Sequence, residues 1–439
     1  MQLKHSRNSS ALALKLLAGI PLAVFSMSMG GCTRASDAQS STPATAATSA
    51  VAQPVELKLQ RVVMLMRHGV RPPTKQQVTP AGTNPSPWPQ WDVDFGELTG
   101  HGRDAVRLLG QWDRINWAAR GLLPATGCPA NGDVEVAASA KSRTQATARA
   151  LVEGMAPDCG INVAFPADKR DDVEFHPLDT RAVAIDADAA LKAVQALMPA
   201  GGMAAEVQAQ APLFALLNQA MGCTPAAACD ISKMPAGLEH KDGDRPGVGN
   251  PFGVASTASQ TFLLEYLEGK PMKDVAWGHL TREQVSILLK FHALKFRYEG
   301  HAPYVAARAA TPLAARMLAA VEHGAKLTVL VGHDTNIADL GGMLDLHWQV
   351  PSYPSDDPPP GGAIGFEVLA DPSGAQFVRA FYRSQTMDQV RELQKLDAGN
   401  PASYQYIPIP GCAERCPLAD FEKIVKDKLV PVLRRPVLP

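Results

Sequence analysis

The stretch of sequence that decides the fold is Val62-Val63-Met64-Leu65-Met66, an apolar run that leads directly into Arg67-His68-Gly69-Val70-Arg71-Pro72-Pro73-Thr74-Lys75. A continuous apolar run without alternation is typical of a strand that is buried on both faces of a parallel sheet. The basic residues follow at once, so they lie where the strand ends. The stretch therefore predicts a central strand that presents arginine and histidine at its carboxyl end.

Two later segments repeat this pattern of a short strand followed by polar residues. Val134-Glu135-Val136-Ala137-Ala138 precedes Ser139-Ala140-Lys141-Ser142-Arg143 and a helical stretch at 145–155. Leu327-Thr328-Val329-Leu330-Val331 precedes Gly332-His333-Asp334 and a second helical pattern. In open α/β sheets, ligands bind at the carboxyl ends of parallel strands. The three segments together predict an α/β fold with one shared site that attracts anions.

The rest of the chain predicts a helical insertion into this sheet domain. A length of 439 residues suggests about two to three domains. We expect an α/β catalytic domain at 55–165 and 306–439, interrupted by a mostly helical insertion domain at 166–305. Strand-like runs at 364–369 and 377–382 predict a β-hairpin that extends the sheet. Within the insertion, helical patterns occur at 189–198, 211–221, 259–267 and 282–297.

Charge and hydropathy exclude two classes of protein. The chain has 42 Lys and Arg against 43 Asp and Glu, a formal net charge of -1. This balance excludes a general basic surface for nucleic acid, so any anion site has to be local. No interior stretch supplies about eighteen uninterrupted apolar residues, which excludes a multispanning membrane protein.

The first residues are typical of an export signal. Lys4, Arg7 and Lys15 form a positively charged region, and the apolar run at 16–29 that follows is short for a membrane span. The run ends in Met29-Gly30-Gly31-Cys32, which resembles the bacterial lipoprotein box, although Met29 and Gly30 are not its usual residues. We therefore predict a signal peptide at 1–32 with a lipid anchor on Cys32, ordinary signal-peptidase cleavage just downstream being the alternative.

The residues after this signal predict a tether and an exported location. Residues 33–54 are rich in Ser, Thr, Ala and Gln, so they cannot bury enough apolar surface to offset the entropy of ordering, and we expect a flexible linker. The expected location of the protein is the periplasm or the outer membrane, to which the lipid would anchor it.

The cysteine count agrees with an oxidising compartment. Of seven cysteines, six remain when Cys32 is set aside. Cys223 with Cys229, and Cys412 with Cys416, are close enough to close short loops, which leaves Cys128 with Cys159. Six cysteines allow many pairings, so the spacing alone does not prove this one. Metal binding by these cysteines is not favoured, because no C-x-x-C pair or histidine cluster accompanies them.

The polar residues at the three strand ends predict phosphoryl chemistry. The guanidiniums of Arg67, Arg71 and Arg143 can clamp a tetrahedral dianion through charge-assisted hydrogen bonds and stay charged at any working pH. The same groups would stabilise the equatorial oxygens of a phosphoryl group during its transfer. No carboxylate cluster suited to a metal ion is evident, so we expect neither a metal nor another cofactor.

The residues that follow the three strands also include candidates for the nucleophile and for the general acid. Neighbouring cations lower the pKa of His68, which keeps its imidazole neutral and nucleophilic in mildly acidic conditions. Asp334 is the acid in the three loops suited to protonating the leaving oxygen, and His333 would add a donor to the phosphoryl group. His101, His176, His292 and the remaining histidines have no such context and are expected to be surface or packing residues.

These motifs resemble those of the histidine acid phosphatases, branch 2 of the histidine phosphatase superfamily. Residues 67–73 match the R-H-G-x-R-x-P signature, and His333-Asp334 is similar to the distal H-D pair. In order and type of element the resemblance extends over nearly all of 55–439. The subgroup that looks closest is the bacterial exported phytases and related acid phosphatases, on the segments 67–75, 332–342, 359–362 and 411–416.

The resemblance implies a fold and a set of roles. The fold would be a phosphoglycerate-mutase-like parallel sheet flanked by helices. His68 would be the phosphorylated nucleophile and Asp334 the proton donor, while Thr74 and Lys75 would line the substrate pocket. The residues expected to bind the phosphate are Arg67, Arg71, Arg143 and His333. Two departures affect the substrate: a cysteine pair of that subgroup is missing, and Gln260 stands where an acidic residue is expected.

We therefore expect an exported, monomeric acid phosphatase that hydrolyses a small phosphomonoester through a phosphohistidine. Phytate or a sugar phosphate is the expected substrate. A glucose-1-phosphatase-like or broad-specificity acid phosphatase is the first alternative. A cytosolic mutase or bisphosphatase of the wider superfamily fits poorly with the signal peptide, the cysteines and the insertion. A lipoprotein that binds phosphorylated ligands without turnover would be favoured only if His68 or Asp334 were absent.

Overall fold

The structure is a computed structural model, and it describes residues 57–84, 86–223, 229–240, 242–413 and 415–434. The predicted signal peptide, the linker and Cys32 lie outside the described residues. Within those residues, no helix is both long enough and apolar enough to cross a membrane.

One mixed sheet forms the centre of the fold, in the order β10-β8-β7-β1-β6-β2-β3, with β9 paired to β8. The parallel part runs from β1 (Lys58–Arg67) through β6 (Leu327–Gly332) and β2 (Val134–Ala138) to β3 (Val163–Ala164). The antiparallel part consists of β7 (Ala363–Ala370), β8 (Gln376–Ser384), β9 (Ser403–Ile407) and β10 (Cys416–Pro417). The predicted α/β fold with three neighbouring parallel strands is confirmed.

The predicted hairpin is also confirmed, and its turn explains its register. β7 and β8 pair from Ala363 opposite Arg383 to Ala370 opposite Gln376. At the turn, the side chain of Asp371 accepts hydrogen bonds from the backbone N–H groups of Ser373 and Ala375. A short polar side chain that binds its own backbone in this way favours a tight turn over a longer strand.

Strand β1 is buried on both faces, as its apolar run predicts. Its side chains alternate between two hydrophobic clusters, because successive residues of a strand point to opposite faces. Val63 and Leu65 belong to one cluster, whereas Val62, Met64 and Met66 belong to the other. Every residue from 62 to 66 has an exposed fraction of 0%.

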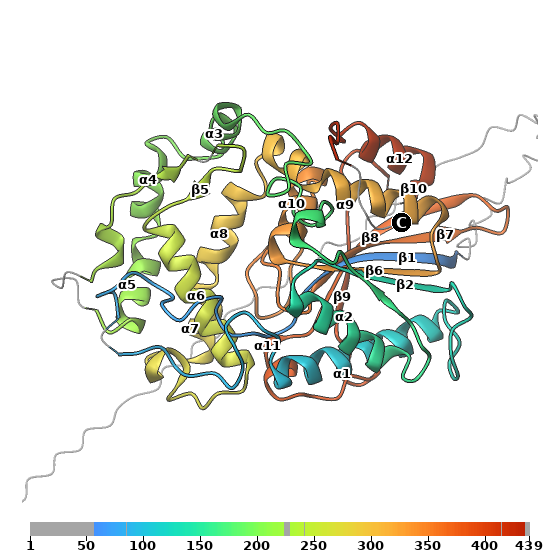
Figure 1. The fold of residues 1–439 in the computed structure, drawn as a ribbon, viewed down its shortest axis with the longest axis horizontal. Helices are drawn as coiled ribbons and strands as arrows, with labels where there is room; N and C mark the ends of the chain where they lie inside the picture. Colours follow the sequence, from blue (N-terminus) through green and yellow to red (C-terminus); the bar gives the residue numbers. More distant parts are fainter. Residues whose placement is uncertain (1–56, 85, 224–228, 241, 414, 435–439) are drawn as a thin grey trace, which may run out of the picture. The chain divides into compact units, whose positions relative to one another are not determined.

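Helices cover both faces of the sheet (Figure 1). On one face lie α1 (Gly100–Ala119) and α2 (Ser142–Met155), and on the other α9 (Pro303–His323), α10 (Asp334–Leu344) and α12 (Leu418–Lys426). α1 and α2 pack closely through glycines, since a Cβ on Gly154 would lie 2.0 Å from the carbonyl oxygen of Arg107. This close packing fixes α2, which carries Arg143 in its first turn.

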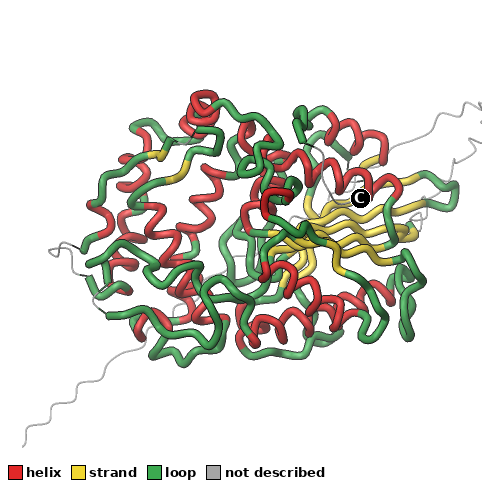
Figure 2. Tube along the Cα trace, viewed as in Figure 1, coloured by secondary structure: helices red, strands yellow, loops and turns green. Residues whose placement is uncertain are grey.

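The region between β3 and α9 is mostly helical, and Figure 2 shows its helices gathered beside the strands. α6 (Phe252–Leu267) begins well before the predicted start at residue 259, because its first turns contain small and polar residues that packing buries despite their weak apolar pattern. The helix predicted at 282–297 is two helices, α7 (Arg282–Leu288) and α8 (Lys290–Glu299), which meet at Leu289. The other α-helices and strands of this region are α3 (Ala187–Gln195), α4 (Gly202–Ala209), α5 (Ala211–Ala220), β4 (Leu238–Glu239) and β5 (Gly247–Val248). α11 (Met387–Arg391) lies between β8 and β9.

We propose that this helical region is the insertion domain. Because α9 begins at Pro303, the boundary that the sequence places between 305 and 306 falls inside the first turn of that helix.

Three disulfides are present among the described residues. They join Cys128 to Cys159, Cys223 to Cys229 and Cys412 to Cys416. These are the pairs that the spacing of the six cysteines favoured.

Candidate active site

The carboxyl ends of β1, β2 and β6 meet at one edge of the sheet. Arg67 at the end of β1 lies in register with Gly332 at the end of β6, and the backbone N–H of Ser139, just after β2, donates to the carbonyl of Val331. A cavity of about 270 Å³ opens at this edge. Of the predicted residues, Arg67, Arg71, Thr74, Lys75 and Asp334 line it.

The other three predicted residues adjoin this cavity through the residues that line it. Nε of Arg71 lies 3.4 Å from Nε2 of His68, and the ring of His68 lies 5.6 Å from the ring of His333. Nη2 of Arg143 lies 3.3 Å from Nδ1 of His333. The structure therefore brings together all eight residues predicted from the sequence.

Arg67 is almost fully buried, and its guanidinium is held by contacts with three other residues. Nη1 donates to the carbonyl of Pro358 at 2.6 Å, and Nη2 donates to Oε1 of Gln260 at 3.0 Å and lies 2.7 Å from Oδ2 of Asp334. Its Nε is buried and has no hydrogen-bond partner among the described residues. A buried donor without a partner is costly, so an anion that bound this nitrogen would offset that cost.

The tautomer of His68 follows from its contacts. Nδ1 lies 2.9 Å from the carbonyl oxygen of Gly69, which can only accept, so Nδ1 carries the hydrogen. Nε2 is then the unprotonated nitrogen, and it accepts from Nε of Arg71 at 3.4 Å. Burial, and then the charges of Arg71, Arg143 and Arg67, hold the pKa of His68 well below its usual range. The imidazole is therefore neutral, and Nε2 is its unprotonated nitrogen.

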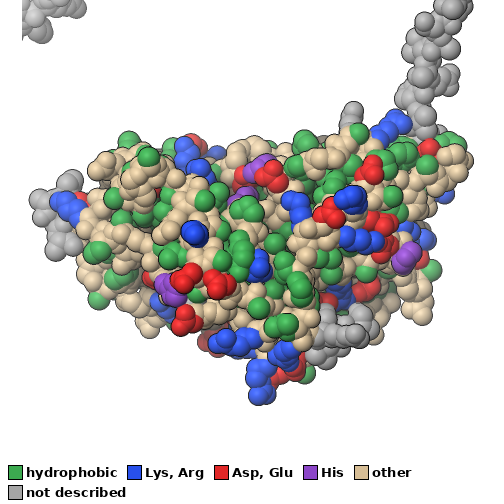
Figure 3. Space-filling model, turned by 90° about the horizontal axis from the view of Figure 1, so that it is seen from above, with side chains coloured by type: hydrophobic (Ala, Val, Ile, Leu, Met, Phe, Trp, Pro, Cys, Tyr) green, Lys and Arg blue, Asp and Glu red, His purple; other side chains and the backbone are tan. Residues whose placement is uncertain are grey.

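The guanidiniums crowd one another, which is typical of a site built for an anion. Burial, and then the charges of Arg143 and Arg67, lower the pKa of Arg71 to about 9. Burial also lowers the pKa of Arg143, whose Nε is buried and lacks a partner. Since like charges repel in a site of low polarity, a bound dianion would relieve this repulsion. On the face shown in Figure 3, by contrast, basic and acidic side chains are intermixed.

Arg143 occupies an unusual place in its helix. It is the second residue of α2, whose first turn contains no acidic residue and whose N-cap, Lys141, makes no capping bond with its side chain. A cation at a helix N-terminus opposes the helix dipole. The N-terminal end of α2 and the guanidinium of Arg143 together favour an anion at this place.

Asp334 begins α10 and is held between two basic side chains. Burial alone would raise the pKa of Asp334, but Arg67 and a hydrogen bond from His292 hold it well below its usual range. Nε2 of His292 lies 3.7 Å from Oδ2 of Asp334, and its Nδ1 lies 2.5 Å from Oδ1 of Asp357. Asp334 is thus an ionised carboxylate when no substrate is bound.

The expectation that His292 is an ordinary surface or packing residue was wrong, whereas His176 is a packing residue that lies beside the site. His292 lines the cavity and contacts Asp334, and the ring of His176 lies 5.1 Å from that of His333. Lys295, one turn along α8 from His292, lines the cavity as well. No local pattern marks these three residues, because only the packing of distant segments brings them to the site. Gln260, which stands where the resemblance leads one to expect an acidic residue, accepts a hydrogen bond from Arg67.

Comparison with known proteins agrees with this geometry. Residues 58–205 match the family model of the histidine phosphatase superfamily, branch 2. The chain is 34% identical to the phytase AppA of Escherichia coli (strain K12) over 86% of this chain and 93% of that protein. It is 31% identical to a glucose-1-phosphatase of Salmonella typhimurium over 86% of this chain and 94% of that protein.

The fold is similar to that of a solved relative. The crystal structure of a Klebsiella phytase superposes with a TM-score of 0.80 at 31% identity, over 88% of this chain and 100% of that one. The likeness thus extends over most of the chain. The chain therefore belongs to branch 2 of the histidine phosphatase superfamily and is a phosphatase.

Proposed function

We propose that the protein hydrolyses phosphomonoesters through a phosphohistidine on His68. The observation that carries this proposal is the unprotonated Nε2 of a buried, neutral imidazole beside three guanidiniums. Nε2 attacks phosphorus, and the bond from phosphorus to the ester oxygen breaks. The leaving oxygen takes a proton from Asp334, which has taken it up from solvent because the bound dianion raises the pKa of the carboxyl.

The second step regenerates a free His68 and a protonated Asp334, which loses its proton to solvent once orthophosphate has left. The carboxylate of Asp334 takes a proton from a water molecule as the water oxygen attacks the phosphohistidine. The bond from phosphorus to Nε2 breaks, and orthophosphate leaves. Throughout, Arg67, Arg71 and Arg143 stabilise the charge on the equatorial oxygens.

The preferred substrate that we propose is phytate or a related phosphorylated sugar alcohol. A multiply phosphorylated substrate needs cations beyond the clamp, and Lys75 and Lys295 line the same cavity. The identity to the Escherichia coli phytase supports this choice. A glucose-1-phosphatase-like activity is the second candidate, because the neutral Gln260 stands beside Arg67 and offers a buried, unpartnered amide nitrogen to a substrate hydroxyl or phosphate oxygen.

A substrate panel tests this proposal. Initial rates on phytate, glucose 1-phosphate, a nucleotide and an aryl phosphate would be compared as kcat/KM, with and without a chelator. Rapid quenching with labelled substrate should trap an acid-labile phosphoenzyme in the wild type and none in His68→Ala. Normal turnover by His68→Ala would overturn the mechanism.

We also propose that the chain is exported, is anchored by a lipid on Cys32 and acts as a monomer. Metabolic labelling with a radioactive fatty acid in a bacterial host should mark the wild type and leave Cys32→Ser unlabelled.

A further inference from the structure

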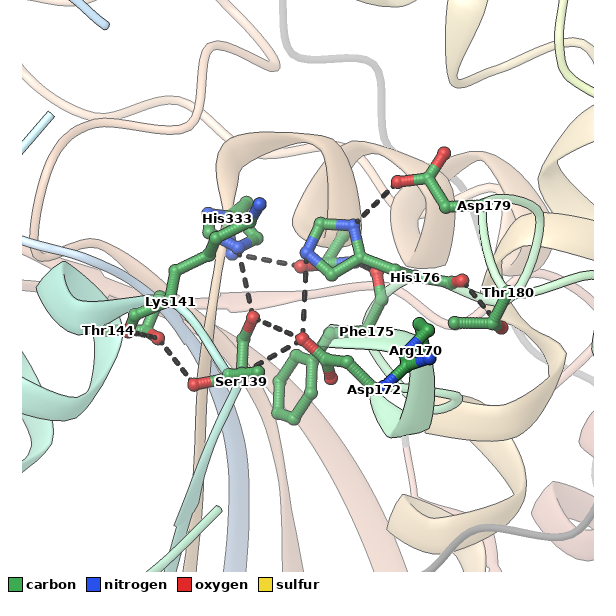
Figure 4. A network of polar contacts seen from close by, with 12 residues as sticks. Ser139, Lys141, Thr144, Arg170, Asp172, Phe175, His176, Asp179, Thr180 and His333 are labelled. Carbon is green, nitrogen blue, oxygen red and sulfur yellow. Dashed lines mark hydrogen bonds and ion pairs between the residues drawn. The ribbon is translucent and has the colours of Figure 1, made fainter. Parts of the chain in front are cut away.

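A chain of hydrogen bonds runs away from the catalytic cavity behind His333 (Figure 4). Nη2 of Arg143 lies 3.3 Å from Nδ1 of His333, and Nε2 of His333 lies 3.3 Å from Oγ of Ser139. The Ser139 hydroxyl donates in turn to Oδ2 of Asp172 at 2.6 Å. All three inner members of the chain, His333, Ser139 and Asp172, are buried.

The direction of each bond in this chain is fixed. A guanidinium can only donate, so Nδ1 of His333 accepts. The hydroxyl of Ser139 donates its one hydrogen to Asp172, so its oxygen accepts the hydrogen bond from Nε2 of His333. The geometry thus selects one neutral tautomer of His333, with its hydrogen on Nε2. Burial, followed by the charges of Arg143 and His176, holds the pKa of His333 well below its usual range, in agreement with a neutral ring.

Ser139 sits in a rigid frame. Its backbone N–H donates to the carbonyl of Val331 at 3.0 Å, and its own carbonyl accepts from the hydroxyl of Thr144 at 2.8 Å. Asp172 is held in place as well, since Oδ2 also accepts from the backbone N–H of Ala140 at 2.9 Å. Through its backbone and its hydroxyl, Ser139 therefore joins the end of β2, the start of α2 and the segment around Asp172.

The outer end of the chain is tied to α10. His176 lies between two carboxylates, with Nε2 3.7 Å from Oδ2 of Asp172 and Nδ1 3.3 Å from Oδ2 of Asp179. Asn336 donates to the carbonyl of Phe175 and accepts from the backbone N–H of His333. The segment that carries Asp172 and His176 is thereby held against the start of the helix that follows His333.

Arg143 depends on this chain more than the other two arginines of the clamp do. Its Nε is buried without a partner, and within the described residues the contact with His333 is the one hydrogen bond of its side chain. Arg67, by contrast, is fixed by three further groups. A ring of His333 that turned or changed tautomer would release the guanidinium of Arg143.

We propose that Ser139 and Asp172 are positioning residues, which fix the tautomer and orientation of His333 and, through it, the guanidinium of Arg143. The effect on catalysis rests on the proposed function, but the effect on His333 does not. Neither residue would touch the substrate. Their role is to present Arg143 to the phosphate in one orientation, and misplacement of such a group by about 1 Å can cost roughly a hundredfold in rate.

The first test is independent of activity. Nitrogen-15 spectra of histidine-labelled protein report which ring nitrogen carries the hydrogen, and His333→Asn identifies the signal of His333. The wild type should show the Nε2–H form, and Ser139→Thr should keep it because the hydroxyl is retained. Ser139→Ala and Asp172→Asn should both shift the signal toward the Nδ1–H form or an average of the two. A wild-type signal in both of these variants would overturn the proposal.

The second test measures the effect on the clamp. In Ser139→Ala and Asp172→Asn we expect kcat/KM to fall roughly ten- to a hundredfold and the inhibition constant of inorganic phosphate to rise in parallel. Ser139→Thr should restore most of both. Asp179→Asn is the matched control, since it removes the other carboxylate beside His176 and should stay near the wild type.

The two tests separate two kinds of failure. An unchanged phosphate inhibition constant in Ser139→Ala and Asp172→Asn would overturn the link from His333 to Arg143. If Ser139→Ala does not fold, Asp172→Asn carries the same comparison. A wild type that lacks phosphatase activity on every ester would contradict the proposed function, while the tautomer measurement would still decide the role of Ser139 and Asp172.

Discussion

Nη2 of Arg67 lies 2.7 Å from Oδ2 of Asp334, and the same nitrogen donates to Gln260 at 3.0 Å. Nη2 of Arg67, a residue of the proposed phosphate clamp, is therefore in direct contact with Asp334, the proposed proton donor. A phosphate dianion that binds Arg67 competes with Asp334 for it. Because the dianion weakens this ion pair and adds negative charge nearby, it raises the pKa of Asp334. Substrate binding thus favours the protonated acid that the chemistry needs.

Replacing Asp334 by Asn should have an effect that depends on the leaving group. An alkoxide needs a proton as it leaves, whereas a good aryl leaving group does not. We expect a loss of roughly a hundredfold or more in kcat for an alkyl phosphate and a much smaller loss for an aryl phosphate. An equal loss on both substrates would mean that Asp334 orients Arg67 instead of supplying a proton.

Replacing Arg71 by Gln should shift the acid limb of the pH profile. After burial, the charge of Arg71 is the largest cause that lowers the pKa of His68, so its removal raises that pKa. Since the protonated imidazole cannot attack, activity at about pH 4 to 5 should fall by more than activity near neutrality. The measurement is kcat/KM on an aryl phosphate across this range. An acid limb at an unchanged pH would contradict the role given to Arg71 in tuning His68.

Part of this site could be predicted from local sequence, and part could not. The apolar run of β1 and the residues after it predict both the central strand and Arg67, because strand, turn and clamp are contiguous. His292 lies on α8 and reaches Asp334 only because α8 packs against α10. No spacing of residues along the chain therefore predicts this contact. The break between α7 and α8 at Leu289 could not be predicted for a related reason. The helical pattern of the sequence continues through Leu289, and tertiary packing decides where the first helix ends.

Replacing Gly154 by Ala should destabilise the protein by separating α1 from α2. The new Cβ would lie 2.0 Å from the carbonyl oxygen of Arg107, a backbone atom that cannot turn away. We expect a loss of about 1–3 kcal/mol in the free energy of unfolding, measured with urea. Activity should fall as well, because α2 carries Arg143.

Gly100→Ala is the matched control for that variant. Gly100 begins α1, and its added Cβ would meet no atom within 4 Å. Its stability should stay within about 0.5 kcal/mol of the wild type. Equal stability of Gly154→Ala and Gly100→Ala would show that α1 and α2 can separate without cost.

Replacing Gln260 by Glu should change both affinity and pH dependence. The new carboxylate would compete with phosphate for Nη2 of Arg67, so KM should rise. It would also lie beside Asp334 and, as a like charge, raise the pKa of that group. The basic limb of the kcat profile on an alkyl phosphate should therefore move to higher pH. A basic limb that stays in place would argue that Asp334 is not the group titrating there.

Lys75 tests whether the substrate carries several phosphates. Only one phosphate of phytate can occupy the arginine clamp during chemistry, so the others need cations farther out in the cavity. Lys75 lies four residues beyond Arg71 in the sequence, lines the cavity and is exposed. An exposed lysine–phosphate contact is screened by water, so Lys75→Ala should lower kcat/KM for phytate by roughly five- to tenfold.

An aryl monophosphate has no second phosphate for Lys75 to bind, so its kcat/KM should be nearly unchanged in the same variant. Lys58→Ala is the control, because Lys58 is an exposed lysine at the opposite end of β1. The loss on phytate should also shrink as salt is added, since the contact is electrostatic. If kcat/KM falls equally for both substrates, Lys75 acts on the loop that carries Arg71 and not on the substrate. A monophosphorylated sugar then becomes the better candidate for the substrate.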